Sequence, residues 1–487
     1  MQVSDGNSAF AGFGPMPLTV ADLLHARPLV VSAETTTRAA AQQMAAADQN
    51  ALIIADQHGA AVGIVTDSDL RRRVVAAGTP GETPIAAVMT GPVIQIRSEA
   101  LYFEAVHAML ESDVHHLLVT RGGHPVGVLS ERDLVSAHAD GPLFVARRID
   151  RARSLEDLAA LKSSRDRAIA MLHRAGASAF DLGRIAAENN DRLAIRAIAL
   201  VQRDLGAPPA RYCWLGLGSE GRREQSIKTD QDNALVYADE PGAPATREYF
   251  RELGRRIVAA LAAAGIPECP GGFMASNPEM CRPLGSWRTQ LRRALTRADP
   301  RDIATSAIYF DTRTIAGDAD LAAPLLTDLH TIARHAPATL GLLLADAISH
   351  RPPLGIFGGL ATDRGGPHRG TFNIKTQGVS PVVEIVRVFA LAHGLSETST
   401  IQRLQTLLQH GAIPETDARD LQAAYEYLWR LRLDHHLRQA ADGAPLDDHV
   451  NPRALSRAEQ HLLRDHFKAI ASVQSYVGLQ VTALLGG

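Results

Sequence analysis

Cysteine is scarce in this chain. Its 487 residues include only three cysteines, Cys213, Cys269 and Cys281, and no two of them form a CxxC pair. A disulfide framework is therefore not expected, and a reducing compartment such as the cytoplasm fits better. Long apolar runs are also missing. No stretch of about 18 apolar residues occurs, so no membrane-spanning helix is expected.

An excess of charge of one sign is lacking as well. The net charge is −3, from 50 Lys and Arg against 53 Asp and Glu, which gives no electrostatic reason to expect nucleic-acid binding. Residues 1–17 lack the basic start and apolar stretch of a secretory signal, and we expect a flexible N-terminus there. With 46% hydrophobic and 21% charged residues, the chain has the composition of a soluble globular protein of about three domains.

An internal repeat occupies the first 140 residues. The segment from Gly63 to Asp69 (GIVTDSD) recurs 64 residues later, from Gly127 to Asp133 (GVLSERD), and the apolar segment that begins at Pro28 recurs at Pro92. Each copy predicts a short strand, a helix, two strands and a second helix. A repeat of this length indicates two similar structural units in tandem.

Four polar residues of the repeat have two possible roles. The hydroxyls of Thr66 and Ser130 are expected where a strand leads into a helix, and Asp69 and Asp133 follow in the first helical turn. In a single copy this pattern is explained by a capping box. Two copies at the same spacing favour a specific module, in which the hydroxyls help to bind a phosphate and the carboxylates accept hydrogen bonds from a ribose diol.

The repeat resembles the tandem cystathionine-β-synthase (CBS) domain pair. The resemblance covers residues 18–140, as two domains at 18–80 and 81–140. It implies an adenine nucleotide (AMP, ADP or ATP) as ligand, with Thr66, Asp69, Ser130 and Asp133 as its contacts. It also implies a homodimer formed through the CBS domains.

The rest of the chain alternates between helical and mixed segments. Amphipathic patterns predict a helical connector over residues 141–206 and a helical C-terminal domain over 321–487. Between them, residues 207–320 contain apolar strands and the motif with the most chemical content. The fold class expected is therefore α+β multidomain.

Two aspartates mark that central segment. Asp230 and Asp232 stand two residues apart at the start of an apolar run that ends at Tyr237. Alternate residues of a strand point to the same side, so the two carboxylates are expected together. Paired carboxylates suit a Mg²⁺ ion that also holds phosphate oxygens. We therefore expect Asp230 and Asp232 to be metal ligands and catalytic residues.

A phosphate-binding segment is expected just before the two aspartates. Gly218 would let backbone amides approach phosphates, and the Ser219 hydroxyl would add a hydrogen bond. Three basic residues would supply positive charge to a triphosphate: Arg222, Arg223 and Lys228.

The Gly-Ser and Asp-x-Asp pattern resembles the DNA-polymerase-β-type nucleotidyltransferase superfamily. It is most similar to the branch that contains the bacterial PII-protein uridylyltransferase, and to CBS-linked nucleotidyltransferases. The blocks around Gly271–Asn277 and Ile308–Asp318 are similar to the same subfamily. The resemblance implies an NTP substrate, Mg²⁺ and a third carboxylate, for which Glu268 and Asp311 are both candidates. Asp311 could equally be a structural partner of Arg313.

A lysine near the start of the C-terminal domain has two interpretations. Lys375 could reach a nucleotide, or it could be a solvated lysine at a helix entrance.

Three candidate functions follow from these patterns. The first is an enzyme that moves a nucleoside monophosphate from an NTP to an acceptor, preferably a protein, under CBS control. The second is a catalytically inactive nucleotide-sensing protein of signal transduction. The third, a transferase acting on nucleic acid, is disfavoured by the charge.

Overall fold

The computed structural model describes residues 19–24, 26–137, 141–239, 244–296, 307–355 and 359–485. The expected flexible N-terminus, residues 1–17, lies outside them. The chain divides into two compact units, of which the first comprises Met1–Arg147 and Arg167–Ala177 and the second Arg148–Asp166 and Ser178–Gly487. Each unit is described by itself.

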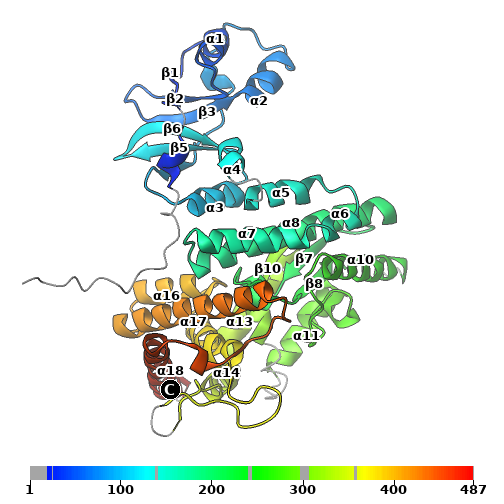
Figure 1. Ribbon diagram of the computed structural model, residues 1–487. Coiled ribbons are helices and arrows are strands. Elements are labelled where there is room, and N and C mark those ends of the chain that lie inside the picture. The colour runs from blue at the N-terminus through cyan, green and yellow to red at the C-terminus, as the bar shows by residue number, and fades with distance from the viewer. Residues whose placement is uncertain are drawn as a thin grey trace, which may run out of the picture. The chain divides into compact units, whose positions relative to one another are not determined.

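The first unit contains the two repeats, each with the predicted order of elements (Figure 1). The first repeat comprises η1 (Val20–Leu23), β1 (Val30–Ser32), α1 (Thr37–Ala47), β2 (Ala51–Ala55), β3 (Ala61–Thr66), α2 (Asp67–Asp69), η2 (Leu70–Val75) and η3 (Ile85–Ala87). The second comprises β4 (Gln95–Arg97), α3 (Tyr102–Ser112), β5 (His116–Arg121), β6 (His124–Ser130) and α4 (Glu131–Ala137).

The two repeats form matching three-stranded sheets. Their orders are β1-β2-β3 and β4-β5-β6, and in each sheet the first pair of strands is parallel and the second antiparallel. Apolar side chains from both sheets share one buried cluster that includes Ile53, Ile64 and Leu118. The repeats therefore pack on each other through their sheets, and the prediction from the 64-residue repeat is confirmed.

A four-stranded sheet stands at the centre of the second unit. Its order is β10 (Arg313–Gly317), β7 (Tyr212–Gly216), β8 (Asn233–Tyr237) and β9 (Cys281–Pro283). β7 is antiparallel to both β10 and β8, whereas β8 and β9 are parallel. The short helix α9 (Gly218–Gly221) follows β7 directly. All five residues of β8 are buried, so the strand runs through the core.

Helices precede this sheet in the chain and also connect its strands. Residues 141–206 are helical, as expected, in α5 (Pro142–Arg151), α6 (Leu155–Ala159), α7 (Lys162–Arg174) and α8 (Ala179–Leu205), with parts of α5 and α7 assigned to the first unit. The sheet region adds α10 (Pro244–Ala263), η4 (Pro278–Met280), α11 (Leu284–Thr296) and η5 (Ala307–Asp311). No described helix is long and apolar enough to cross a membrane.

The C-terminal region is helical, as predicted. It comprises α13 (Ala319–His335), α14 (Pro337–Ser349), η6 (Lys375–Val379), α15 (Ser380–Ala392), α16 (Thr400–Gln409), α17 (Glu415–Ala441), η7 (Pro452–Ala454) and α18 (Arg457–Leu485). The two short strands β11 (Phe372–Asn373) and β12 (His449–Val450) pair antiparallel. Its apolar side chains are continuous with those of the sheet in one core cluster, so sheet and helices fold as one body.

Candidate functional site

The four polar residues of the repeats form two identical capping boxes. In the first repeat the Thr66 backbone N–H and hydroxyl donate to the Asp69 carboxylate at 2.9 and 2.7 Å. In the second repeat Ser130 donates to Asp133 in the same way, at 2.8 and 2.6 Å. The helix-capping interpretation is therefore realised in both copies. It accounts for the local conformation and leaves a ligand role for these residues as a proposal.

His116 lies near both capping aspartates. Burial, followed by the neighbouring His115, lowers the pKa of His116, while the charges of Asp133 and Asp69 oppose this shift. His116 pairs with Ser130 in the second sheet, so this histidine adjoins the second capping box. The charge of Asp69, from the first capping box, acts on the same histidine.

Two glycines shape the turn after β7. Gly218 has φ +54°, and a Cβ there would stand 3.2 Å from Asp232 Oδ2 and 3.1 Å from Ile308 Cγ1. At Gly221 a Cβ would stand 1.7 Å from the backbone oxygen of Asp311. Only glycine fits at Gly221, and at Gly218 it also suits the left-handed backbone. The pair therefore lets the α9 turn approach both Asp232 and η5 closely.

The Asp-Gln-Asp-Asn segment alternates between two environments. Gln231 is buried and donates to the backbone oxygens of Val258 (3.0 Å) and Ile266 (2.8 Å), while the buried Asn233 accepts from Ala275 N–H at 2.9 Å. Asp230 precedes Gln231, and Asp232 lies between Gln231 and Asn233. Both aspartates are only half-buried. The alternation expected of a strand is present, and it leaves both carboxylates free of the core.

The strand itself is shorter than predicted. We expected it to begin near Asp230, whereas β8 begins at Asn233. Leu217 N–H still donates to Asp232 O at 2.8 Å, but Gln231 N–H donates to Pro267 O at 2.9 Å instead of to β7. The pairing with β7 therefore ends at Asp232, and Asp230 lies in the loop just before the sheet.

The two carboxylates repel each other. Burial, and next the charge of Asp230, raise the pKa of Asp232 to about 6, although a hydrogen bond from the Cys269 thiol and the charge of Lys375 oppose the rise. Holding both carboxylates ionised is unfavourable without a cation. The chemistry of this pair therefore fits a divalent metal ion.

A cleft opens beside Asp230. Its volume is about 420 Å³, counted to its open mouth, and its walls come from the loop after β7 and from η6, α15 and α17. Ser219, Lys228 and Asp230 line one wall, while Lys375 and Trp429 line the other. Lys375 Nζ lies 3.9 Å from Asp230 Oδ1. The lysine noted near the start of the C-terminal domain thus belongs to this site.

All three predicted phosphate-binding cations lie within ion-pair distance of carboxylates of the protein, and two of them line the cleft. Arg222 donates to Glu224 at 2.7 Å and to Asp311 at 2.6 Å. Lys228 donates to Asp448 at 2.8 Å and is 39% exposed. Both line the cleft, but the charge of Arg222 is neutralised inside the protein, which gives it a structural part in fixing the loop.

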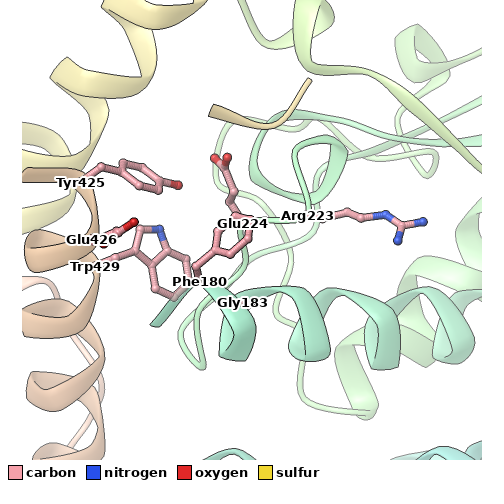
Figure 2. Close-up of a pocket in the computed structure, with 7 residues that line it drawn as sticks. All are labelled: Phe180, Gly183, Arg223, Glu224, Tyr425, Glu426 and Trp429. Carbon is pink, nitrogen blue, oxygen red and sulfur yellow. The ribbon is translucent and has the colours of Figure 1, made fainter. Parts of the chain in front are cut away.

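Arg223 does not line the cleft. Its backbone has φ +57°, and its guanidinium lies 3.7 Å from Glu188 on α8. Figure 2 shows its side chain pointing away from a smaller, mainly apolar pocket that Phe180, Tyr425 and Trp429 line. The expectation that Arg223 faces the same phosphates as Ser219 is thus not met by its position, because the left-handed backbone turns the side chain towards α8.

Asp311 has a structural role. It is fully buried and accepts hydrogen bonds from three arginines: Arg222 (2.6 Å), Arg387 (2.7 and 3.0 Å) and Arg403 (2.7 Å). The prediction that Arg313 pairs with Asp311 was wrong, because Arg313 instead donates to Asp191 at 2.7 Å. Sequence reasoning missed the true partners because two of them lie on α15 and α16, far along the chain. Asp311 therefore has no free oxygen for a metal.

Two other carboxylates, Glu268 and Glu220, are the remaining candidates for a third metal ligand. Glu268 is exposed in the loop after α10 and directly precedes Cys269, whose thiol contacts Asp232. Glu220 is buried, and its Oε2 accepts from Asp232 N–H at 3.3 Å. Burial, and next the charge of Asp191, raise the pKa of Glu220 to about 8. Glu220 supports the backbone of Asp232 rather than facing the cleft, so Glu268 remains the open candidate for a third ligand.

Helix α8 contributes a row of buried polar residues that the sequence reasoning assigned to a plain spacer. Asn190 donates to Gln225 at 2.9 Å, and Asp191 holds Arg313. Arg313 in turn donates to Glu220 O at 3.1 Å. The uninterrupted polar succession Glu188-Asn-Asn-Asp191 within an amphipathic helix was the signal that could have indicated this role. The helix therefore anchors the loop that carries the site.

Three families match parts of the chain. Residues 20–76 and 85–140 match the CBS domain, residues 163–301 match the family described as Putative nucleotidyltransferase DUF294, and residues 337–481 match the Putative nucleotidyltransferase substrate binding domain. The protein is thus an α+β multidomain protein that combines tandem CBS domains with a domain of a nucleotidyltransferase family and a helical C-terminal region. More particularly, most of that helical region matches the Putative nucleotidyltransferase substrate binding domain.

Two curated relatives each match about a quarter of the chain. The CBS domain-containing protein CBSCBSPB2 of Arabidopsis thaliana is 34% identical over 112 residues, which are 23% of this chain and 21% of that protein. Arabinose 5-phosphate isomerase KdsD of Salmonella typhi is 31% identical over 122 residues, 25% of this chain and 37% of that protein. The chain spans about a fifth of the first relative's length.

Solved structures also match over the CBS part. The CBS-domain containing protein ATU1752 from Agrobacterium tumefaciens has 26% identity and a TM-score of 0.24 over 27% of this chain and 98% of its own. The CBS domain protein PAE2072 from Pyrobaculum aerophilum, solved in complex with AMP, has 23% identity and a TM-score of 0.24 over 25% of this chain and 94% of its own.

Proposed function

We propose that the protein is a regulatory nucleotidyltransferase. It moves a nucleoside monophosphate from an NTP to an acceptor, with a protein side chain as the favoured acceptor, in the manner of the PII-protein uridylyltransferase. The observation that carries the proposal is that Ser219 and Asp230 line a cleft whose far wall is the matched substrate-binding domain, and that Asp232 lies next to Gly218. An adenine nucleotide bound at the CBS pair controls the activity.

Asp230 and Asp232 would hold Mg²⁺. Their mutual repulsion, visible in the raised pKa of Asp232, is the feature that a divalent cation relieves. When bound, Mg²⁺ neutralises charge on the triphosphate and on the departing pyrophosphate. We propose Glu268 as the third carboxylate, since Asp311 is fully engaged by arginines and Glu268 adjoins the Cys269 thiol that contacts Asp232.

The chain's own residues position the substrate. Gly218 leaves room for phosphate oxygens next to the backbone, and the Ser219 hydroxyl can donate to them. Lys375 and Lys228, both partly exposed in the cleft, face the triphosphate from the C-terminal side and from the loop. In the reaction the acceptor hydroxyl oxygen forms a bond to the α-phosphorus, the bond from that phosphorus to the bridging oxygen breaks, pyrophosphate leaves and the hydroxyl proton is released.

Label transfer tests this activity. The full chain is incubated with Mg²⁺, a cell extract and ATP, UTP, CTP or GTP labelled at the α-phosphate, and labelled protein is measured. We expect transfer from at least one nucleotide and its loss in both Asp230→Asn and Asp232→Asn. Glu268→Gln should reduce the rate if it is the third ligand. The exposed Glu279→Gln, at η4, is the matched control. Transfer that survives Asp232→Asn would contradict the proposal.

Lys375 has its own test within the same assay. Lys375→Met should raise KM for the NTP more than it lowers kcat, because the lysine contributes charge to ground-state binding of the triphosphate. Lys468→Met, on the exposed side of α18, is the control. An unchanged KM in Lys375→Met would assign that lysine to the protein surface alone.

A second candidate function is a nucleotide sensor without catalytic activity. It is favoured by two observations: Lys375 lies 3.9 Å from Asp230, so the lysine already partners one of the carboxylates that a metal ion would need, and Arg222 is neutralised by protein carboxylates. A sensor would bind an NTP tightly and transfer no label with any of the four nucleotides. Binding measured by calorimetry together with the transfer assay separates the two functions.

A further inference from the structure

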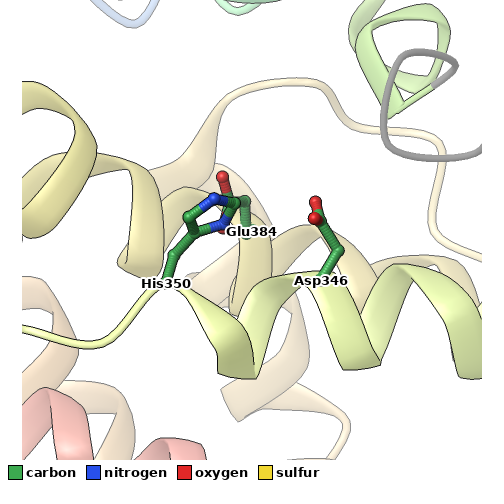
Figure 3. Close-up of side chains that lie close together, drawn as sticks. All are labelled: Asp346, His350 and Glu384. Atoms are coloured by element: carbon green, nitrogen blue, oxygen red, sulfur yellow. The ribbon is translucent and has the colours of Figure 1, made fainter. Parts of the chain in front are cut away.

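A second group of metal-binding side chains lies in the helical C-terminal domain, away from the cleft. Asp346 and His350 stand one turn apart at the end of α14, and Glu384 faces them from α15. One ligand atom of each residue lies within 4.8 Å of the other two. Figure 3 shows the imidazole of His350 beside the Glu384 carboxylate, with Asp346 on the same side of its helix.

The two carboxylates of this group are only partly balanced by basic side chains: His350 contacts Glu384, and the charge of Arg387 also acts on Glu384. His350 Nδ1 lies 3.1 Å from Glu384 Oε2, and in the described part of the chain no lysine or arginine forms an ion pair with Glu384 or Asp346. Arg387, one turn along α15, directs its guanidinium to Asp311 at 2.7 and 3.0 Å. Two carboxylate oxygens and one imidazole nitrogen thus converge, and each can donate an electron pair to a metal ion.

The backbone around the group is held in place. The buried Gln474 of α18 donates to Ala347 O at 2.9 Å and to His350 O at 3.0 Å, which fixes the last turn of α14 and the start of the next segment. The group also stands at the carbonyl end of α14, where the helix dipole favours a cation. Three elements therefore determine the position of His350 before any ion arrives.

We propose that Asp346, His350 and Glu384 bind a Zn²⁺ ion. An imidazole nitrogen with two carboxylate oxygens is a ligand set that suits Zn²⁺, with water in the fourth position. Ligand atoms around one zinc ion stand about 3.4 Å apart at bond lengths of about 2.0–2.2 Å, so small rotations of the three side chains close the present separations. The ion joins α14 to α15 and stabilises the helical domain. It is distinct from the Mg²⁺ of the proposed transferase site.

Zinc binding to the full chain tests the proposal. Protein stripped with a chelator is titrated with Zn²⁺ alone, in the Asp230→Asn/Asp232→Asn background so that the cleft carboxylates do not contribute. We expect one high-affinity Zn²⁺ per chain and a rise in Tm on binding. His350→Ala and Glu384→Gln should each lose that ion and the rise in Tm.

The control separates this site from other histidines. His461 and Asp465 stand four residues apart on α18, with His461 Nε2 3.4 Å from Asp465 Oδ2. They lack a third ligand in the described residues, so His461→Ala should bind Zn²⁺ like the parent. Circular dichroism confirms that each variant is folded, and the isosteric Asp346→Asn serves if His350→Ala is not. The proposal is overturned if the parent binds no Zn²⁺, or if folded site variants bind it as the parent does.

Discussion

Asp311 shows how one buried carboxylate can organise the loop that carries the candidate site. It accepts hydrogen bonds from Arg222 of that loop and from Arg387 and Arg403 of the helical domain. The charges of the three arginines hold its pKa well below the usual range, although burial opposes this. The loop is thereby tied to α15 and α16 through a single side chain.

Asp311→Ala should lower the free energy of unfolding by about 3–5 kcal/mol, because it leaves buried arginines without their partner. Asp230→Ala is the comparison, since Asp230 is 28% exposed and its one ion pair spans 3.9 Å; a change within about 1 kcal/mol is expected there. Urea denaturation of the full chain measures both. Equal losses of unfolding free energy in Asp311→Ala and Asp230→Ala would contradict the structural role of Asp311.

Glu220 gives the protein a pH dependence. Its pKa is raised to about 8, by burial first and then by Asp191, from 4.5. The folded state therefore retains a proton that the unfolded state loses, and this contribution to stability is lost as the pH rises from about 4.5 through 8.

Glu220→Gln should reduce this loss, because the amide stays neutral. Between pH 6 and pH 9 the variant should lose less stability than the parent, by an amount on the order of a few kcal/mol. Denaturation at both pH values provides the measurement, with the exposed Glu279→Gln at η4 as the comparison. Parallel losses in parent and Glu220→Gln would show that Glu220 titrates normally.

At the scale of elements, the short helix α9 depends on its two glycines. Gly221→Ala would place a methyl group 1.7 Å from Asp311 O and force the backbone apart; we expect a cost of at least about 4 kcal/mol. Gly218→Ala would add strain of about 1–2 kcal/mol at φ +54° and should abolish activity while the protein remains folded, because the methyl group contacts Asp232.

A glycine without neighbours provides the control for these two. A methyl group at Gly365 would have no atom within 4 Å, so Gly365→Ala should change stability by less than about 0.5 kcal/mol. Thermal unfolding ranks the three glycine variants by stability, and the label-transfer assay ranks them by activity. If Gly221→Ala folds as stably as Gly365→Ala, the close packing of α9 on η5 is not essential.

The predictable parts of the fold are those that depend on local pattern. The repeat in residues 18–140 was visible because each copy repeats the same strand and helix signals, and the helices of residues 321–487 follow from amphipathic spacing. Asp230 and Asp232 were found because their spacing is itself local. Their expected place within a strand was wrong by three residues, since Gln231 N–H pairs with Pro267 O, a partner that no local pattern reveals.

The remaining features depend on contacts between distant residues. The sequence does not show that Arg222 is neutralised by Asp311, that the left-handed backbone of Arg223 turns it towards α8, or that α17 supplies Trp429 to the cleft. Each requires the tertiary arrangement of segments that lie far apart in the chain. Charge alone therefore suggested the phosphate ligands, and the structure shows which of them line the cleft. Their contact with phosphate stays a prediction.

At the scale of the whole molecule, the proposed control by the CBS pair is tested by the ratio of the label-transfer rate with AMP or ADP to the rate without it. AMP or ADP should change the rate of label transfer by about fivefold or more if it biases two states of the protein. Asp69→Asn combined with Asp133→Asn should bring that ratio to one, because both capping carboxylates are proposed ribose contacts.

The control for this experiment is Glu82→Gln, which alters an exposed ion pair with Arg38 in the same unit. It should keep the parent's response to AMP. Size-exclusion chromatography with light scattering tests the proposed homodimer in the same preparations. A response to AMP that persists in the double variant would place nucleotide control outside the capping residues.

The ion pair between Lys228 and Asp448 has a consequence for biosynthesis. The two residues are 220 positions apart. Glu224 likewise accepts a hydrogen bond from the backbone N–H of Thr400, which lies 176 positions later. During synthesis, the loop with Asp230 and Asp232 emerges from the ribosome before most of the helical domain. The partners of Lys228 and Glu224 are therefore not yet present when the loop appears. A chain that ends after β10 would contain the whole central sheet and still lack a formed cleft.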